Sequence, residues 1–152
     1  MSMEPYPPPP PRRVGPTGPR ADFGPRLAGW LIDGVIVGLV NRVVDAFTTV
    51  AIGLVLGLLV QLAYAVYFIA SASGQTPGMR IMSIRVIDAT TGGRVDPGRA
   101  VVRWLMSIVS GFAFALGYLW MLWDPEKQTW QDKVAGTYVV PTADFPVEQW
   151  PG

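Results

Sequence analysis

Long apolar runs constrain this chain more than any other feature of its sequence. Three stretches, residues 27–44, 49–72 and 104–123, are apolar on nearly all sides, with no polar face that returns at the helical period. Each has about the length, roughly 17–25 residues, that a helix needs to cross a bilayer. In a chain of 152 residues they leave little sequence for a water-soluble core. We therefore expect an all-α membrane protein whose main partner is the lipid bilayer.

The remaining sequence divides around these segments. Residues 1–21 contain a proline run at 7–11 and almost no apolar side chains, which predicts a disordered, polyproline-like tail. The membrane domain then covers residues 22–140 and includes a loop at 73–103. Residues 141–152 form a C-terminal tail.

Composition excludes several classes of function. Lys and Arg number 12 and Asp and Glu number 11, so the net charge is +1, and no basic stripe marks a nucleic-acid surface. Cys and His are absent, which removes disulfides, thiolate and imidazole chemistry. Asp124, Glu126 and Asp132 follow an apolar segment without a nucleophile or metal-ligand spacing, which is typical of a solvated face. We predict no catalytic residue, no metal site, no cofactor and no enzymatic activity.

The arginines predict the orientation of the chain. The first segment is preceded by Arg12, Arg13, Arg20 and Arg26, and the 73–103 loop holds Arg80, Arg85, Arg94, Arg99 and Arg103. The short connection at 41–48 has only Arg42, which Asp45 offsets. By the positive-inside rule, the N-terminus and the 73–103 loop lie in the cytoplasm and the 41–48 turn lies outside the plasma membrane.

The third apolar segment is compatible with two topologies. Its length suffices for one crossing, which would place the C-terminal tail outside. Alternatively, Gly111 and Gly117 allow a bent or re-entrant hairpin that returns the tail to the cytoplasm. The sequence leaves the side of the C-terminus open, with a lean to the cytoplasm.

Two short β-branched stretches favour a cytoplasmic C-terminus. Residues 80–88 and 137–140 have strand-like patterns, and they can pair only if both lie on the same side of the membrane. The turn at 91–93 also predicts a hairpin between residues 85–88 and 94–96. This hairpin would form a small cytoplasmic β element.

Small residues recur at four-residue intervals in each apolar segment. This spacing lets helices approach closely and favours a packed bundle, a homo-oligomer or a subunit of a larger membrane complex. The residues concerned are Gly34, Gly38, Gly53, Gly57, Ser107, Gly111 and Ala115.

Arg26 and Asp33 lie at the start and inside of the first apolar segment, where a charged side chain costs the most free energy. On a helix they share one face and lie roughly 10 Å apart along the axis. A carboxylate at the centre of a membrane helix costs about 2.5–3.5 kcal/mol, so it requires a use or a partner. One hypothesis is an exchange site at which a proton and a small cation compete for Asp33, completed by Gln61 and Tyr64. The other is a structural network in which Asp33 pairs with Arg26 and fixes the helix register.

Four ordered blocks of residues resemble the RDD family of small membrane proteins, named for an arginine and two aspartates. The resemblance covers residues 22 to about 140. Its blocks are Arg26-Leu27-Ala28 with Ile32-Asp33, Gln75 to Arg80 with Arg85 to Asp88, Arg99-Ala100 with Arg103, and Trp130 to Thr137 with Val139-Val140.

The resemblance implies a functional charged set. Arg26 and Asp33 match the arginine and the first aspartate, and Asp132 is the better candidate for the second aspartate, with Asp88 as its rival. In the exchange hypothesis, Arg26 and Arg103 would bias Asp33 toward its charged form. Gln131 stands where a histidine is frequent in the family, which weakens any mechanism that requires an imidazole beside Asp132.

The family resemblance implies a transport role, of the cation/proton exchange type in some members. In this chain such an activity would use Asp33, and the protein would act as an oligomer. The alternative is a non-catalytic accessory or scaffolding subunit that packs against a larger membrane complex through its glycine-lined helices and its tryptophan-rich ends.

Overall fold

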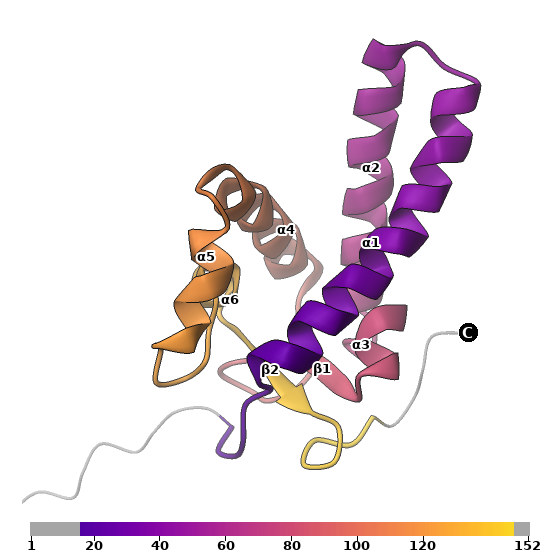
Figure 1. Cartoon of the computed structure of the whole chain (residues 1–152). Helices are drawn as coiled ribbons and strands as arrows, with labels where there is room; N and C mark the ends of the chain where they lie inside the picture. The colour runs from indigo at the N-terminus through magenta and orange to yellow at the C-terminus, as the bar shows by residue number, and fades with distance from the viewer. Residues whose placement is uncertain (1–15, 148–152) are drawn as a thin grey trace, which may run out of the picture.

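Two long helices form a hairpin, and short helices and strands build a base at its open end (Figure 1). The computed structural model describes residues 16–147. Residues 1–15 of the predicted tail, including its proline run, and residues 148–152 lie outside this range. Helix α1 spans Phe23–Ala46 and helix α2 spans Val50–Ile69. The helices agree with the segments predicted at 27–44 and 49–72, apart from a few residues at their ends.

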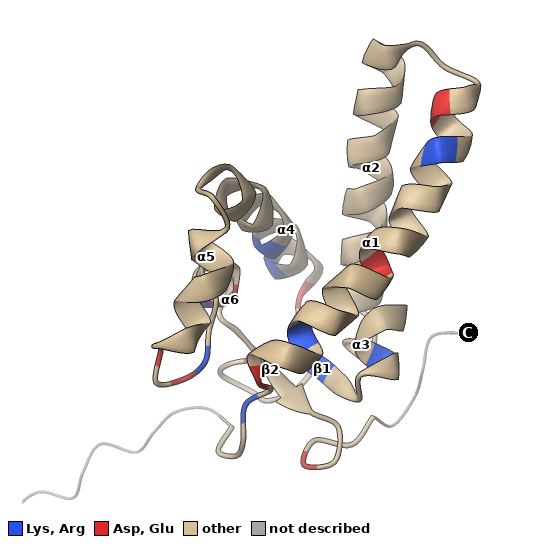
Figure 2. Ribbon diagram, in the orientation of Figure 1, with Lys and Arg blue, Asp and Glu red and all other residues tan. Residues whose placement is uncertain are grey.

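Both hairpin helices are long and apolar enough to cross a membrane. Little of either helix is covered by the rest of the protein, because only 6% of the apolar window of α1 and 17% of that of α2 are buried. Leu39 and Leu54, for example, are 65% and 68% exposed. Helix α2 carries no charged residue at all (Figure 2). These surfaces are suited to contact with lipid, and the prediction of membrane helices is confirmed at this level.

The third apolar segment is bent. Helix α4 (Pro97–Phe112) is followed by α5 (Leu116–Leu119) and the 3₁₀ turn η1 (Trp120–Leu122), and the two halves meet at 111°. The chain reverses at Phe114 and Ala115, which adopt left-handed backbone angles with φ of 54° and 60°.

Glycine contributes to this bend in a way that differs from the prediction. Gly117 lies where α5 folds back against α4, and a Cβ atom at this position would lie 2.1 Å from Ser110 Oγ. Gly117 therefore permits close approach of the two helices, while non-glycine residues supply the left-handed turn. The predicted bent form of the segment is the one observed.

A two-stranded antiparallel sheet lies in the base. Strand β1 (Ile84–Asp88) pairs with β2 (Thr137–Pro141), with Val86 opposite Val139 and Asp88 opposite Thr137. The predicted pairing of these stretches is confirmed, whereas the predicted hairpin with residues 94–96 is wrong. After β1 the chain turns through 89–93, where the Asp88 N–H donates to Gly93 O, and then enters α4.

The sheet also places the two ends of the bent segment together. Because β1 follows α2 and β2 follows α5 and η1, the polypeptide after η1 returns to the side on which α2 ends (Figure 1). Two short helices complete the base, α3 (Pro77–Ile81) before β1 and α6 (Trp130–Ala135) before β2.

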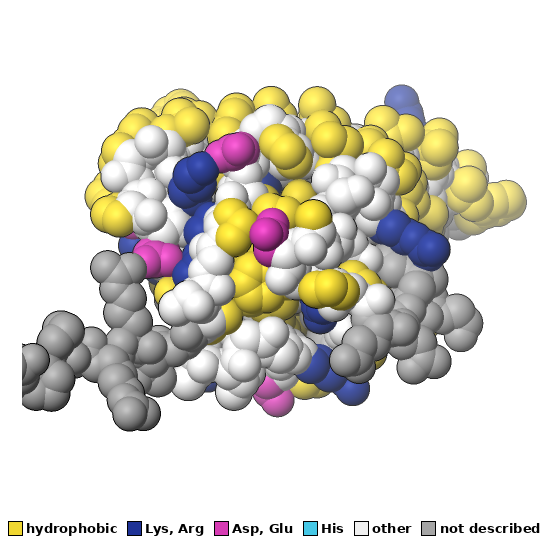
Figure 3. All heavy atoms as spheres, turned by 90° about the horizontal axis from the view of Figure 1, so that it is seen from below, with side chains coloured by type: hydrophobic (Ala, Val, Ile, Leu, Met, Phe, Trp, Pro, Cys, Tyr) yellow, Lys and Arg dark blue, Asp and Glu magenta, His cyan; other side chains and the backbone are white. Residues whose placement is uncertain are grey.

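The closely packed core lies in the base and not between the long helices. Val86 and Ile87 of β1, Val140 of β2, and Val95 are fully buried. Seen from the base, this face carries acidic and basic side chains scattered among a few hydrophobic ones, and hydrophobic side chains are densest along the upper edge of the view (Figure 3). The molecule thus combines a water-compatible base with an apolar hairpin.

The chain contacts the base before the predicted boundary at residue 22. Ala21 is buried and its N–H donates to Val139 O at 2.9 Å. Arg20 lies over the Tyr138 ring, 3.8 Å from its centroid, and pairs with Glu126 at 2.9 Å. The segment that leads into α1 is therefore attached to β2 and to the loop before α6.

Candidate functional site

A cavity of about 760 Å³ lies between the α1–α2 hairpin and the bent pair α4–α5. Helix α1 contributes the longest wall, and α2, α4 and α5 contribute the others. Apolar surface dominates these walls. Polar groups gather at the end near the base, where two clusters centred on Asp33 and Asp132 are found.

Asp33 is half-buried on α1 and accepts three hydrogen bonds from neutral donors. The Tyr64 hydroxyl donates to Oδ1 at 2.7 Å, and the Gly78 N–H donates to the same atom at 2.8 Å. The Thr76 hydroxyl donates to Oδ2 at 2.5 Å. Asp33 thereby joins α1 to α2 and to the first turn of α3. Among the described residues, no Lys or Arg lies within ion-pair distance of it.

The expected pairing of Arg26 with Asp33 is therefore wrong. The two residues do share a face of α1, but the Arg26 side chain turns toward the base and pairs with Asp132. Tyr64, Thr76 and Gly78 donate to Asp33 instead, and they do so without burying a second charge.

Close backbone contact explains how α3 reaches Asp33. Helix α3 begins at Thr76, whose side chain caps it by accepting from Met79 N, and Pro77 occupies its first turn. A Cβ atom at Gly78 would lie 2.1 Å from Gly29 O and 2.8 Å from Asp33 Oδ1. Only a glycine at this position lets the α3 backbone lie against α1 and donate to the carboxylate.

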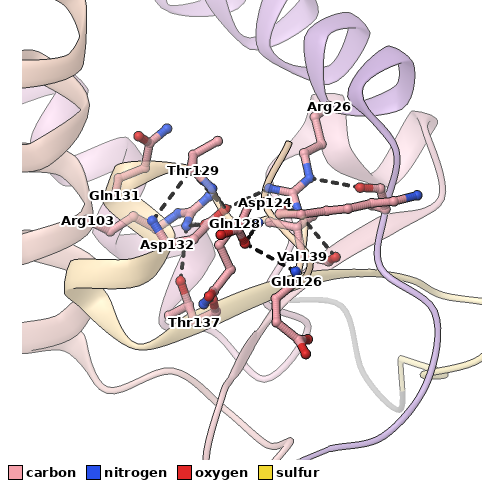
Figure 4. Close-up of polar contacts among 12 residues, drawn as sticks. Arg26, Arg103, Asp124, Glu126, Gln128, Thr129, Gln131, Asp132, Thr137 and Val139 are labelled. Carbon is pink, nitrogen blue, oxygen red and sulfur yellow. Dashed lines mark hydrogen bonds and ion pairs between the residues drawn. The ribbon is translucent and has the colours of Figure 1, made fainter. Parts of the chain in front are cut away.

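Asp132 forms the second cluster and is completely buried. Arg26 Nη1 donates to its Oδ2 at 2.6 Å, and Arg103 Nη1 forms an ion pair with its Oδ1. Figure 4 shows the two guanidinium groups on opposite sides of the carboxylate. Asp132 is also part of a capping box, because it accepts from the Thr129 N–H and hydroxyl and so starts α6.

The two arginines have further partners in the base. Arg26 donates to the carbonyl oxygens of Ala21 and Lys127, and Arg103 donates to Thr137 Oγ1 at 3.0 Å. The Asp132 cluster therefore connects α1, α4, α6 and β2 through one carboxylate. Two cations for one anion leave this end of the cavity with a surplus positive charge.

Asp88, the rival candidate for the second family aspartate, lies in a different contact set. It pairs with Arg99 at 2.7 Å and accepts from the N–H groups of Thr90 and Thr91 at the turn after β1. Burial raises the pKa of Asp88, but the N–H groups of Thr91 and Thr90 and the charge of Arg99 outweigh that effect, so its pKa lies below the ordinary value. The structure thus joins Asp132, and not Asp88, to Arg26.

We expect Asp88 to make the fold sensitive to acid. Since its pKa is lower in the folded than in the unfolded chain, its stabilisation is present above the ordinary pKa of 3.8 and is lost as the pH falls through the folded value. In detergent, the difference in unfolding temperature between wild type and Asp88→Asn should be constant well above pH 3.8 and should narrow as the pH falls below that value. A difference that stays constant with pH would contradict this assignment.

The two polar residues predicted on α2 behave differently. Tyr64 contacts Asp33 directly. Gln61 lies one turn away and lines the same cavity, but its side chain is exposed there, without a hydrogen bond to Asp33.

The small residues of the apolar segments fall into two groups. Gly53 and Gly57 are buried where α2 meets α1, and their Cβ positions would contact the side chains of Asp45 and Asn41. Gly34, Gly38 and Gly111 line the cavity and have no atom within 4 Å of their Cβ positions. Ser107 also lines the cavity and donates to Trp104 O.

Several residues of both clusters were not predicted. Thr76 and Gly78 hold Asp33, and Thr129 and Thr137 hold the Asp132 cluster. The Thr-x-x-Asp spacing of residues 129–132 is a capping-box signal that the sequence offers, although it does not indicate the arginine partners. Within residues 16–147, no group of three or more acidic side chains gathers where it could hold a metal ion.

An apolar helical hairpin on a base that buries a carboxylate between two arginines defines a small helical protein of membrane type. The chain belongs to the RDD family, whose sequence model matches residues 20–136. The match includes Arg26, Asp33 and Asp132, and it confirms the family resemblance.

Two mycobacterial proteins are similar to part of the chain. The proline-rich antigen of Mycobacterium leprae (strain TN) is 36% identical over 70 residues, which is 46% of this chain and 28% of that protein. The proline-rich antigen homolog of Mycobacterium tuberculosis (strain CDC 1551 / Oshkosh) is 34% identical over 68 residues, or 45% of this chain and 28% of that protein. The similarity thus spans about 28% of the length of these curated relatives. No solved structure matches the chain.

Proposed function

We propose that this protein is a small membrane transporter that exchanges a cation for protons at Asp33. The observation that carries the proposal is that the Asp33 carboxylate lies on the cavity wall without a cationic partner among the described residues. An anion in this position is compensated by either a proton or a mobile cation, which is the requirement for exchange.

The distribution of charge supports this proposal. Asp132 has two arginine partners, so it is fully compensated and serves to hold the base together. Asp33 has three neutral donors, which orient its carboxylate without cancelling its charge. The structural role and the exchange role therefore fall to different aspartates.

Proton-coupled flux in proteoliposomes tests the proposal. With purified protein and an imposed pH gradient, we expect added cation to collapse the gradient, and we expect Asp33→Asn to lower the rate by at least about tenfold because the amide cannot exchange a proton. The matched control is Asp45→Asn, the same substitution on the same helix at a residue that does not line the cavity. It should retain flux.

Flux that survives Asp33→Asn in a folded preparation would overturn Asp33 as the exchange site. Size-exclusion chromatography and circular dichroism of each variant distinguish lost exchange from lost fold. Absence of flux in the wild type with every cation tested would favour the second candidate function, which is described next.

That second candidate is a non-catalytic accessory subunit or homo-oligomer. It is favoured by Gly34, Gly38 and Gly111, which leave open space along the cavity where a neighbouring helix would fit. Gly34→Leu would then remove the association while leaving the monomer folded. In either case we propose no enzymatic activity and no cofactor.

We further propose that the protein lies in the plasma membrane with its base in the cytoplasm. Most arginines lie at the base, and the far end of the hairpin has Arg42 beside Asp45 (Figure 2). Because the chain has no cysteine, single cysteines report sidedness directly. An impermeant maleimide on intact cells should label Phe47→Cys and should label Thr90→Cys only after lysis. The reverse pattern would overturn the orientation.

A further inference from the structure

The cavity beside Asp33 has the size of an organic-molecule site. Its volume of about 760 Å³ falls within the range of roughly 300–1,000 Å³ typical of small-molecule pockets, and its surface is mostly apolar with a few polar groups. A bare metal cation needs a cage of about six oxygen ligands instead. Within the described chain, acidic side chains do not gather into such a cage. Asp33 also has both oxygens already engaged by donors.

Aromatic side chains line the same cavity as the Asp33 carboxylate. Trp30 lies one turn before Asp33 on the same face of α1, and Tyr64 is hydrogen-bonded to Asp33. Tyr118 of α5 faces Trp30 across the cavity wall, with ring centroids 6.3 Å apart. Trp104 of α4 lines the same cavity. Aromatic faces attract organic cations through their quadrupole, and a carboxylate adds the counter-charge.

The arginines define which part of the cavity a cation can occupy. Arg26 and Arg103 line the end near the base and together exceed the charge of Asp132. The part beyond Asp33, toward Gly38 and Gly111, contains no Lys or Arg among the residues that line the cavity. A cation is therefore favoured beside Asp33 and away from the two guanidinium groups.

We propose that the cavity binds a lipophilic organic cation, an aromatic or quaternary onium ion, with Asp33 as its counter-charge and Trp30, Tyr64, Trp104 and Tyr118 as its aromatic contacts. This inference rests on the proposed exchange function and names its substrate class. The cavity is suited to this class because it offers apolar surface, aromatic faces and one uncompensated carboxylate, and it lacks an oxygen cage.

Equilibrium binding of radiolabelled tetraphenylphosphonium to the full chain in detergent tests the proposal, with protein-free micelles as the blank. We expect saturable binding with one ion per cavity. Asp33→Asn should weaken it by at least about tenfold because the counter-charge is lost. Asp45→Asn should leave it unchanged.

Gly111→Leu provides a second variant that does not touch Asp33. No atom lies within 4 Å of the Gly111 Cβ position, so the leucine side chain has room to enter the cavity while the fold is kept. Binding should be lost because the cavity is filled. Absence of saturable binding to the wild type, or binding that survives both Asp33→Asn and Gly111→Leu, would overturn the proposal.

Flux measurements separate this inference from the proposed function. One outcome is that tetraphenylphosphonium collapses the pH gradient faster than it does in empty liposomes and in liposomes with Asp33→Asn, while sodium, potassium and lithium have no effect. This outcome supports both the exchange function and the proposed substrate class. If only the alkali cations collapse the gradient, exchange stands and the substrate class is wrong. If tetraphenylphosphonium binds at Asp33 but no cation collapses the gradient, the binding site stands and the exchange function fails.

Discussion

Replacing Gly78 with alanine is expected to prevent the protein from folding stably in the membrane. The added Cβ atom would lie 2.1 Å from Gly29 O, a backbone atom of α1 that cannot move aside without bending the helix. Overpacking usually costs about 1–3 kcal/mol, and a clash with backbone exceeds that range. Displacement of α3 also removes the Gly78 N–H and the Thr76 hydroxyl from Asp33.

Gly34→Ala is the matched control for this substitution. Gly34 is also a glycine near Asp33, but its Cβ position is open, and alanine in a helix interior is favoured over glycine by about 0.5–1 kcal/mol. Melting temperature and yield in detergent should fall sharply for Gly78→Ala and stay level or rise for Gly34→Ala. Equal behaviour of the two variants would contradict the close contact between α3 and α1.

The second large effect is expected for Asp132→Asn. The amide preserves the shape of the side chain and an acceptor for the α6 cap, but it leaves Arg26 and Arg103 buried without a counter-charge. Breaking a buried ion pair from one side typically costs about 3–5 kcal/mol. We therefore expect Asp132→Asn to unfold at much lower temperature or denaturant concentration than the wild type.

A double-mutant cycle isolates the charge effect. In the Asp132→Asn background, Arg103→Met removes one of the two buried arginines that lack a counter-charge and should recover part of the lost stability. In the wild-type background, Arg103→Met should lower the stability of the protein. Asp88→Asn, which removes a carboxylate from a partly exposed pair with Arg99, should cost less than Asp132→Asn. Additive effects of the two substitutions at Asp132 and Arg103 would show that their charges do not interact in the folded protein.

Local patterns predicted much of the fold. The run of apolar residues predicted α1 and α2 because helix formation and lipid contact depend on neighbouring residues along the chain. The β-branched stretches predicted the two strands, and their observed pairing means that both lie on one side. The hairpin predicted from the turn at 91–93 failed because β2 offered β1 a partner that buries Val86 against Val139.

The site shows the limit of that reasoning. Arg26 and Asp33 were paired because they share a helix face, yet each has a nearer partner that is remote in sequence, Asp132 for Arg26 and Thr76 for Asp33. A side chain as long as arginine reaches past its own helix, so its partner depends on what the fold brings near it.

The sequence alone therefore predicts the class of this protein, its two long apolar helices and the identity of the charged residues, since these depend on composition and on spacing within single helices. The partners of those charges, the bend at Phe114 and the cavity beside Asp33 depend on contacts between segments far apart in the chain. Arg26 and Asp132 are separated by more than a hundred residues, and they meet because the segment before α1 is attached to β2 while α6 packs against α4 and β2. Such ion pairs form only when the tertiary structure brings distant segments together, so the periodic patterns of the sequence do not predict them.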